Sequence, residues 1–555
     1  MRSCDPIEEA PGRSSAVAVL AVLCGALFFH GLNTGELYRT ENLRALVAAE
    51  FLRTGNWSVP TLFGQPLLTK PPGTYAAITA ASYPFGRVSD ATARLPSALA
   101  ASAIVFLFYW YVARQVGRCG GAIAAAIVPC SALWLEKSVS AEIDMLHVAW
   151  VAAALLFFFR AVECDEKLPG DRPAGMPALL WWWLASLCMA AGTLTKWSAP
   201  VFFYAAAVPF LSWRGKLRLL LARGHLTASA LAAAVCISWV WIAVEEAGWG
   251  LFYQTLRAEA LTRLSYRHHA GDHTLALSLL HPVKVMAVNL PWSPFALLVL
   301  CRGFLAASDE RRRRLVQAFY CWTWPNLLIC TLLPDHATRH SFALFPGIAG
   351  LAAMSWLAFL EKRLPPKLAE WHSRLAIAAL AGLAAAVFAG SALLARVDGP
   401  SAPLLVFISA ASAGVLVLGM RASRKAEFGR VLACIIALWV ALKVGYVESY
   451  VQLRNGARQA RARGELLERK VPAGEILYAF KYRGEGMLFY YGRPVLRLRG
   501  PQDLPGRSSV VYCLLIPEEW SALQKNNRWR PVAKFELQDE QRRPVVLAAL
   551  APRAG

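Results

Sequence analysis

The sequence predicts an all-α polytopic membrane protein with a small α/β domain at its C-terminal end. Of its 555 residues, 57% are hydrophobic and only 17% are charged, whereas soluble globular chains carry about 25% charged residues. Apolar segments of about 20 residues, long enough to cross a bilayer as helices, recur along the chain. The 20 Trp and 16 Tyr residues suit aromatic belts at membrane–water interfaces. Lipid is therefore the predicted solvent of most of the chain.

Hydropathy predicts about thirteen transmembrane helices within residues 1–449, which form the predicted membrane domain. Residues 450–555 begin as a charged helix and continue with strand-like runs at 476–480 and 510–516, which predict the α/β domain. The predicted spans lie near residues 15–33, 94–113, 119–136, 143–162, 178–195, 197–213, 225–247, 284–306, 315–334, 341–359, 375–396, 402–420 and 429–449.

Basic residues predict the orientation of these spans. Clusters such as Arg311–Arg314 and Arg421–Lys425 lie between apolar segments, all on one side of the predicted membrane, as cytoplasmic loops require. The N-terminus is then cytoplasmic and the C-terminal domain lies outside. The long loops 34–93 and 248–283 also lie outside. Because the net charge of +22 is placed in such loops, we expect membrane lipids and not nucleic acid as partners.

The cysteines and histidines do not define a cofactor. The 12 Cys residues are scattered, without the close pairs of a disulfide framework or a zinc site. His268 and His269 are adjacent, which alone is weak evidence for a metal ligand pair. The sequence therefore predicts no certain cofactor, and it leaves a divalent metal open.

The first outer loop carries a carboxylate and a constrained cation, Glu41 and Lys70. Two prolines, Pro71 and Pro72, follow Lys70 and restrict its backbone. A carboxylate can take a proton from an attacking hydroxyl, and a fixed cation can stabilise a departing phosphate. The alternative is that both are solvated loop charges, which is the commoner situation.

Asp144 is a third candidate, because it lies where the fourth span begins. An ionisable group at that depth is costly to bury and is often functional. It could equally be a first-turn acid that the helix dipole stabilises.

Cationic side chains gather in the same outer segments. They suit an anionic lipid headgroup that enters from the outer leaflet, although Arg and Lys also snorkel to membrane interfaces without any ligand. The candidates for contacts with a donor phosphate or sugar are Arg44, Lys196, Arg263, Arg267, His268, Arg339 and His340.

Several motifs resemble one family. The first loop contains Gly55-Asn56-Trp57, Thr69-Lys70-Pro71-Pro72 and Ala93-Arg94-Leu95-Pro96-Ser97, and later segments contain Leu194-Thr195-Lys196 and Tyr491-Gly492-Arg493-Pro494-Val495. Over nearly the whole chain, these motifs resemble bacterial membrane glycosyltransferases of the GT-C superfamily. That superfamily includes protein O-mannosyltransferases and the 4-amino-4-deoxy-L-arabinose transferase that modifies lipid A.

The resemblance implies an enzyme of the bacterial inner membrane. It would move a sugar with inversion from undecaprenyl phosphate, or a similar polyprenyl phosphate, to a periplasmic acceptor that is lipid A, a protein or a glycan. Glu41, Asp144 and Lys70 are the implied catalytic residues. The chain departs from the family's pattern at Thr40 and Thr69, where relatives carry Asp and Glu. A transporter or lipid flippase and a non-catalytic relative are the alternative functions.

Overall fold

The computed structural model is mostly helical and describes residues 13–166, 177–264, 275–306, 308–396, 402–505, 510–525 and 528–552. Eight of its helical segments are long and apolar enough to cross a membrane. The chain is thus a multi-pass membrane protein. The eight segments are Asp90–Ile127 (α4), Ile143–Glu166 (α6), Ala178–Thr195 (α7), Arg223–Ala247 (α9), Thr338–Leu360 (η5 and α15), Pro366–Leu394 (α16), Ala402–Arg424 (α17) and Phe428–Lys470 (α18 to α20).

Some predicted spans differ from the helices that form. The span expected at 284–306 is divided among α11 (Leu275–Val288), α12 (Trp292–Leu298) and α13 (Arg302–Ala306). Pro291, at the N-cap of α12, explains one break, because proline cannot continue a preceding helix. The first span and α8 are apolar but shorter than 18 residues, so the count of thirteen stays a prediction. The first span comprises α1 (Arg13–Cys24) and η1 (Gly25–Phe29), α8 spans Ala199–Trp213, and α14 spans Glu310–Leu332.

The C-terminal part contains a five-stranded mixed sheet in the order β4-β3-β5-β7-β6. Strand β3 pairs in parallel with β4 and β5, whereas β7 pairs antiparallel with β5 and β6. Strands β3 and β5 fall within the two strand-like runs of the sequence. The strands are β3 (Leu477–Ala479), β4 (Val495–Arg497), β5 (Val511–Leu515), β6 (Trp529–Gln538) and β7 (Pro544–Pro552), with helices α20 (Ala460–Lys470), α21 (Glu485–Tyr491) and α22 (Pro517–Gln524).

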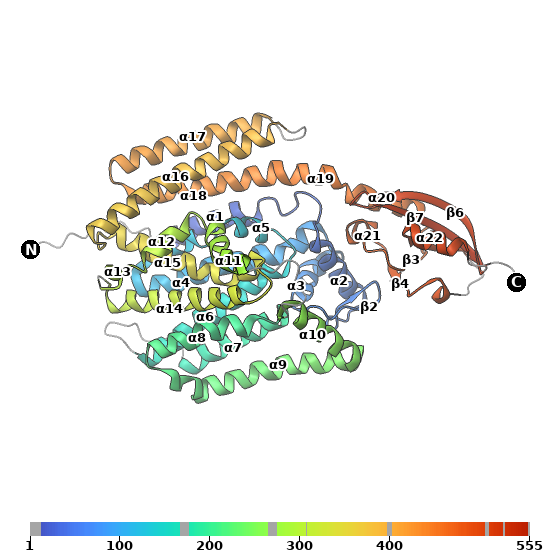
Figure 1. Cartoon of the computed structure of the whole chain (residues 1–555), viewed down its shortest axis with the longest axis horizontal. Coiled ribbons are helices and arrows are strands. Elements are labelled where there is room, and N and C mark those ends of the chain that lie inside the picture. Colours follow the sequence, from blue (N-terminus) through green and yellow to red (C-terminus); the bar gives the residue numbers. More distant parts are fainter. Residues whose placement is uncertain are drawn as a thin grey trace, which may run out of the picture.

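The sheet lies at one end of the helical bundle (Figure 1). Helices α2 (Thr40–Thr54) and α3 (Gly73–Ser82) stand between the bundle and the sheet, and α10 (Trp249–Leu264) lies at the same end of the bundle. More than half of the side chains of α2 are buried in protein, because α2 packs against α3 and α21.

The first loop and the C-terminal part share an apolar core. Phe51 and Tyr75 from the loop belong to the same buried cluster as Leu467, Met487 and Leu547. Backbone bonds reinforce this contact, since the Arg497 N–H donates to the Phe63 carbonyl over 2.9 Å. Shared apolar burial removes the water that would otherwise separate the two parts, so the sheet is held firmly against the loop.

A buried ionic network joins α4, α6, α8 and α14 at the other end of the bundle. Arg314 donates to Gln115 over 2.6 Å, and Gln115 in turn donates to Glu163 over 2.6 Å. Arg160 also donates to Glu163 over 2.8 Å. The side chains of Glu163 and Arg314 are each 1% exposed, so every charge in the network depends on its partner for stabilisation.

Removing one member of this network should therefore destabilise the bundle. We expect Glu163→Ala to cost about 3–5 kcal/mol, because it leaves the buried Arg160 guanidinium without its carboxylate partner. The control is Glu370→Ala, which breaks the exposed Arg374–Glu370 pair and should cost under about 1 kcal/mol. Thermal unfolding of both variants in detergent measures the difference. Equal midpoints would contradict a stabilising role for the network.

Candidate functional site

Lys70 and Lys196 reach one cavity from separate elements. Lys70 follows β2 (Gln65–Pro66) and precedes α3, whereas Lys196 caps the C-terminus of α7. Gly73 allows the two segments to approach closely. A Cβ at this position would lie 2.8 Å from both the Leu194 carbonyl oxygen and the Thr195 hydroxyl, so any larger residue would force the segments apart.

Each lysine is paired with an acid. The Lys70 ammonium donates to Glu259 of α10 over 2.5 Å. The Lys196 ammonium donates to Asp144, in the first turn of α6, over 2.9 Å. Both lysines are largely buried, at 8% exposed. Partly desolvated cations interact strongly with any anion that reaches them.

The cavity that both lysines line has a volume of about 300 Å³. Its walls are mostly apolar side chains of α8, α10 and α14, including Val201, Leu256 and Ile329. His340, which pairs with Asp335 over 3.3 Å, also lines it. An apolar cavity with two cations suits the phosphate end of a lipid, because each part of that ligand meets matching chemistry.

Glu41 lies in a second, smaller pocket of about 90 Å³. Its carboxylate accepts from Arg94 Nε over 3.1 Å, from the Ala141 N–H over 2.8 Å and from the Tyr38 N–H over 2.7 Å. Its side chain is only 6% exposed. Both carboxylate oxygens are thus engaged by donors of the protein itself.

Glu142 lines the same small pocket and was not among the residues singled out from the sequence. It accepts from the Thr40 hydroxyl over 3.0 Å and from the Lys137 ammonium. Burial alone would lower the pKa of Lys137, but Glu142 and Glu136 raise it above its ordinary value, so this ammonium stays charged. The Glu142 side chain, at 14% exposed, is more accessible than that of Glu41.

The remaining predicted residues divide into three groups. Arg339 is exposed and lines the pocket of Glu41. Arg44 is buried on α2, where it donates to the Tyr75 hydroxyl and lies over the Tyr75 ring. The side chain of Arg263, in the last turn of α10, and all of Arg267 and His268 lie outside the described residues.

The structure therefore brings Lys70, Lys196, Asp144 and His340 together and places Glu41 and Arg339 at a neighbouring pocket. Glu142 and Glu259 were not predicted from the sequence, because neither lies in a recognisable motif. Glu142 contacts Thr40, and Glu259 contacts Lys70, only in the folded chain. The described residues contain no group of three or more His, Cys, Asp or Glu side chains that could hold a metal ion.

Comparisons with known proteins give the family and fold that this chain resembles. Residues 69–242 match the family model described as dolichyl-phosphate-mannose-protein mannosyltransferase. An undecaprenyl phosphate-α-4-amino-4-deoxy-L-arabinose arabinosyl transferase of Erwinia tasmaniensis is 26% identical, over 60% of this chain and 58% of its own length. A transferase of the same name from Sodalis glossinidius is 25% identical, over 78% of this chain and 75% of its own length. The chain thus spans little more than half of the Erwinia relative in that alignment.

The solved structure of ArnT from Cupriavidus metallidurans bound to undecaprenyl phosphate superposes with a TM-score of 0.72 at 15% identity. It covers 97% of this chain and 98% of its own. The apo structure of the same protein gives a TM-score of 0.69. The resemblance predicted from the motifs is confirmed: this chain has the GT-C fold of the ArnT type.

Proposed function

We propose that this chain is a membrane glycosyltransferase that moves a sugar from a polyprenyl phosphate, such as undecaprenyl phosphate, to an acceptor outside the cytoplasm. The observation that carries the proposal is the convergence of Lys70 and Lys196 on an apolar cavity. The similar proteins are named for sugar transfer from undecaprenyl phosphate. A lipid phosphate matches both features of the cavity, because its phosphate can bind the ammonium groups and its hydrocarbon chain can pack on the apolar walls.

The two lysines would act on the leaving group. As the bond between the sugar's anomeric carbon and the phosphate oxygen breaks, negative charge grows on the phosphate. Ammonium groups already fixed at that position stabilise this charge without reorganising. Glu259 and Asp144 hold the ammonium groups in place. Displacement at the anomeric carbon in one step would invert its configuration.

Glu142 is the carboxylate that we assign as the base. The acceptor hydroxyl must lose a proton as it attacks, and a base needs an oxygen that can reach that hydroxyl. Both carboxylates accept hydrogen bonds, but Glu41 is the more buried and is held by Arg94 and two backbone N–H groups, so we assign it a role in positioning the first loop. Glu142 is more exposed in the same pocket and accepts from two side chains, the Lys137 ammonium and the hydroxyl of Thr40, the residue that stands where relatives carry Asp.

The orientation and the acceptor belong to the same proposal. The first loop, α10 and the sheet lie at one end of the bundle (Figure 1). The basic loops predicted to face the cytoplasm lie at the other end, where the Arg214–Glu310 ion pair joins α8 and α14. We infer a cytoplasmic N-terminus, a membrane domain over 1–449 and a periplasmic domain over 450–555. The acceptor would be a periplasmic lipid, protein or glycan. Arg263, Arg267 and His268 stay predicted donor contacts.

Removing either lysine should impair both donor binding and transfer. We expect Lys70→Met and Lys196→Met each to lower turnover about 100-fold or more, because the departing phosphate loses a fixed cation. Turnover is measured as undecaprenyl phosphate released from undecaprenyl phosphate-α-4-amino-4-deoxy-L-arabinose in membranes. Native mass spectrometry with undecaprenyl phosphate measures binding independently of the sugar.

The matched control for these variants is Lys216→Met, which removes a lysine paired with Asp165 at the opposite end of the bundle. It should keep wild-type binding and turnover. Wild-type lipid binding by both cavity variants would exclude this cavity as the phosphate site.

Glu142 and Glu41 should respond differently to the same isosteric change. We expect Glu142→Gln to lower turnover about 100-fold or more with little change in the thermal midpoint. Glu41→Gln should lower the midpoint, because it removes the charge that compensates buried Arg94. Detergent-solubilised protein supplies the midpoint, and membranes supply turnover. Full turnover in Glu142→Gln would show that another group acts as the base.

A further inference from the structure

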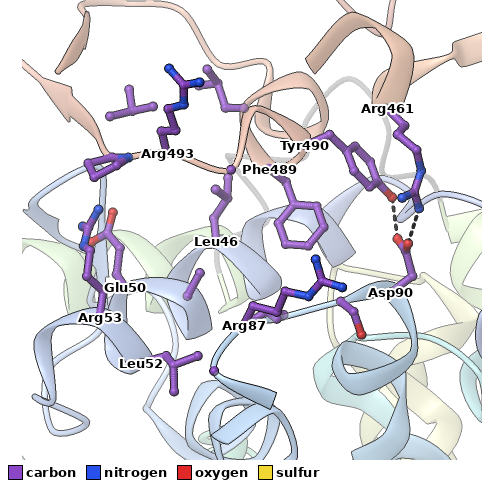
Figure 2. Close-up of a pocket in the computed structure, with 18 of the residues that line it drawn as sticks. Leu46, Glu50, Leu52, Arg53, Arg87, Asp90, Arg461, Phe489, Tyr490 and Arg493 are labelled. Carbon is purple, nitrogen blue, oxygen red and sulfur yellow. Dashed lines mark hydrogen bonds and ion pairs between the residues drawn. The ribbon is translucent and has the colours of Figure 1, made fainter. Parts of the chain in front are cut away.

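A second large cavity lies away from the lysine site, between the first loop and the C-terminal sheet. Its volume is about 910 Å³, which is ample for an oligosaccharide-sized ligand. Helix α2 and residues 86–90 form one wall, and α21 with the segment Gly492–Val495 forms the other. Figure 2 shows the labelled side chains arranged around this open space.

Arginines dominate the charge of this cavity. Four of them line it, against two carboxylates, Glu50 and Asp90. Clustered guanidinium groups recognise phosphate or carboxylate groups in a geometry that lysine cannot match. The four are Arg53, Arg87, Arg461 and Arg493.

Both carboxylates are already satisfied within the protein. Glu50 accepts from the Thr61 hydroxyl and the Phe63 N–H, each over 2.5 Å. Asp90 accepts from Arg461 and from the Tyr490 hydroxyl (Figure 2). Burial and the nearby Asp90 raise the pKa of Tyr490, so the hydroxyl keeps the proton that it donates. Asp90 is compensated by Arg461, and with four guanidinium groups against two carboxylates the cavity keeps an excess of positive charge.

Two of the arginines are available. Arg461 is bound to Asp90, and Arg493 donates to Glu468 and to the Val471 carbonyl. Arg53 and Arg87 are exposed and form no ion pair or hydrogen bond with another residue in the described part of the chain. They come from separate segments of the first-loop wall, the end of α2 and the segment before α4 (Figure 2), so one ligand with two anionic groups can meet both.

The rest of the lining suits a sugar. Phe489 presents aromatic surface on the α21 side, and the apolar face of a pyranose packs on such a ring while the hydroxyls stay solvated. The neighbouring Tyr490 ring is covered by the Arg461 guanidinium at 4.7 Å. The backbone also comes close to the space at Gly86 and Gly492, both at positive φ. Side chains are absent there, which leaves backbone polar groups accessible to hydroxyls.

We propose that this cavity binds an anionic saccharide, a glycan that carries phosphate or carboxylate groups, at a site separate from the donor-lipid cavity. Arg53 and Arg87 bind the anionic groups, and Phe489 packs against a sugar ring. Because the walls come from both the first loop and the C-terminal part, the site exists only in the assembled chain. Binding here does not require that transfer occur at the lysine site.

The test is a glycan array probed with the full chain in lipid nanodiscs. The array carries neutral, phosphorylated and uronic-acid saccharides together with anionic peptides. We expect selective binding of anionic saccharides, with the phosphorylated and uronic-acid arms separating the two kinds of anion. The Arg53→Ala/Arg87→Ala double variant should bind about tenfold or more weakly. Its thermal midpoint should not change, since neither side chain supports the described fold.

The control is Arg374→Ala/Arg430→Ala, which removes the same charge from exposed positions of the membrane helices. It should bind as the wild type does, which separates the cavity from general electrostatic attraction. Three results would overturn the proposal: no preference for anionic over neutral saccharides, stronger binding of anionic peptides, or undiminished binding by the double variant. Loss of donor turnover in the Lys70 variant, with saccharide binding retained, would show that the two sites are independent.

Discussion

The guanidinium of Arg94 organises the end of the molecule where both cavities lie. It is 3% exposed, it pairs with Glu41, and it donates to the carbonyls of Leu32, Thr34 and Glu36 at 2.9–3.1 Å. A buried charge of this kind is stable only while its partners stay in place. The chain that leaves the first helix is therefore fixed at several consecutive carbonyls, and α2 starts from a defined position.

This anchoring extends to the C-terminal sheet. The Glu36 carboxylate accepts from the N–H groups of Ala460 and Arg461 at the start of α20, over 2.8 and 2.9 Å, where a helix N-terminus favours negative charge. One turn before Arg94, Asp90 binds Arg461 and Tyr490. Together with the shared apolar core, these contacts make the first loop and the sheet one structural unit, although more than 350 residues separate them in sequence.

Local sequence predicts those features whose cause is local. Apolar length indicates the membrane helices, and the depth of Asp144 together with the motif around Lys70 indicates the lysine cavity. Pro291 in the sequence also indicates a helix break within 284–306, whereas hydropathy alone predicts one continuous span there. Glu259 and Glu142 could not be recognised from the sequence, because each resembles a solvated surface acid. Glu259 contacts Lys70, which is 189 residues away in the sequence, and Glu142 contacts Thr40, which is 102 residues away. The motif Tyr491–Val495 supplies part of one wall of the arginine cavity, but no local pattern shows that it lies opposite α2.

Helix α2 connects the two cavities physically. One part of its surface carries Arg44, which binds Tyr75 on α3, the helix that directly follows Lys70 in the chain. Other positions of the helix, Glu50 and Arg53, line the arginine cavity. A small displacement of α2 would therefore move residues near both cavities. Because Arg94 and the shared apolar core resist that displacement, the fold favours two preformed sites at fixed separation over one site that closes around its ligand.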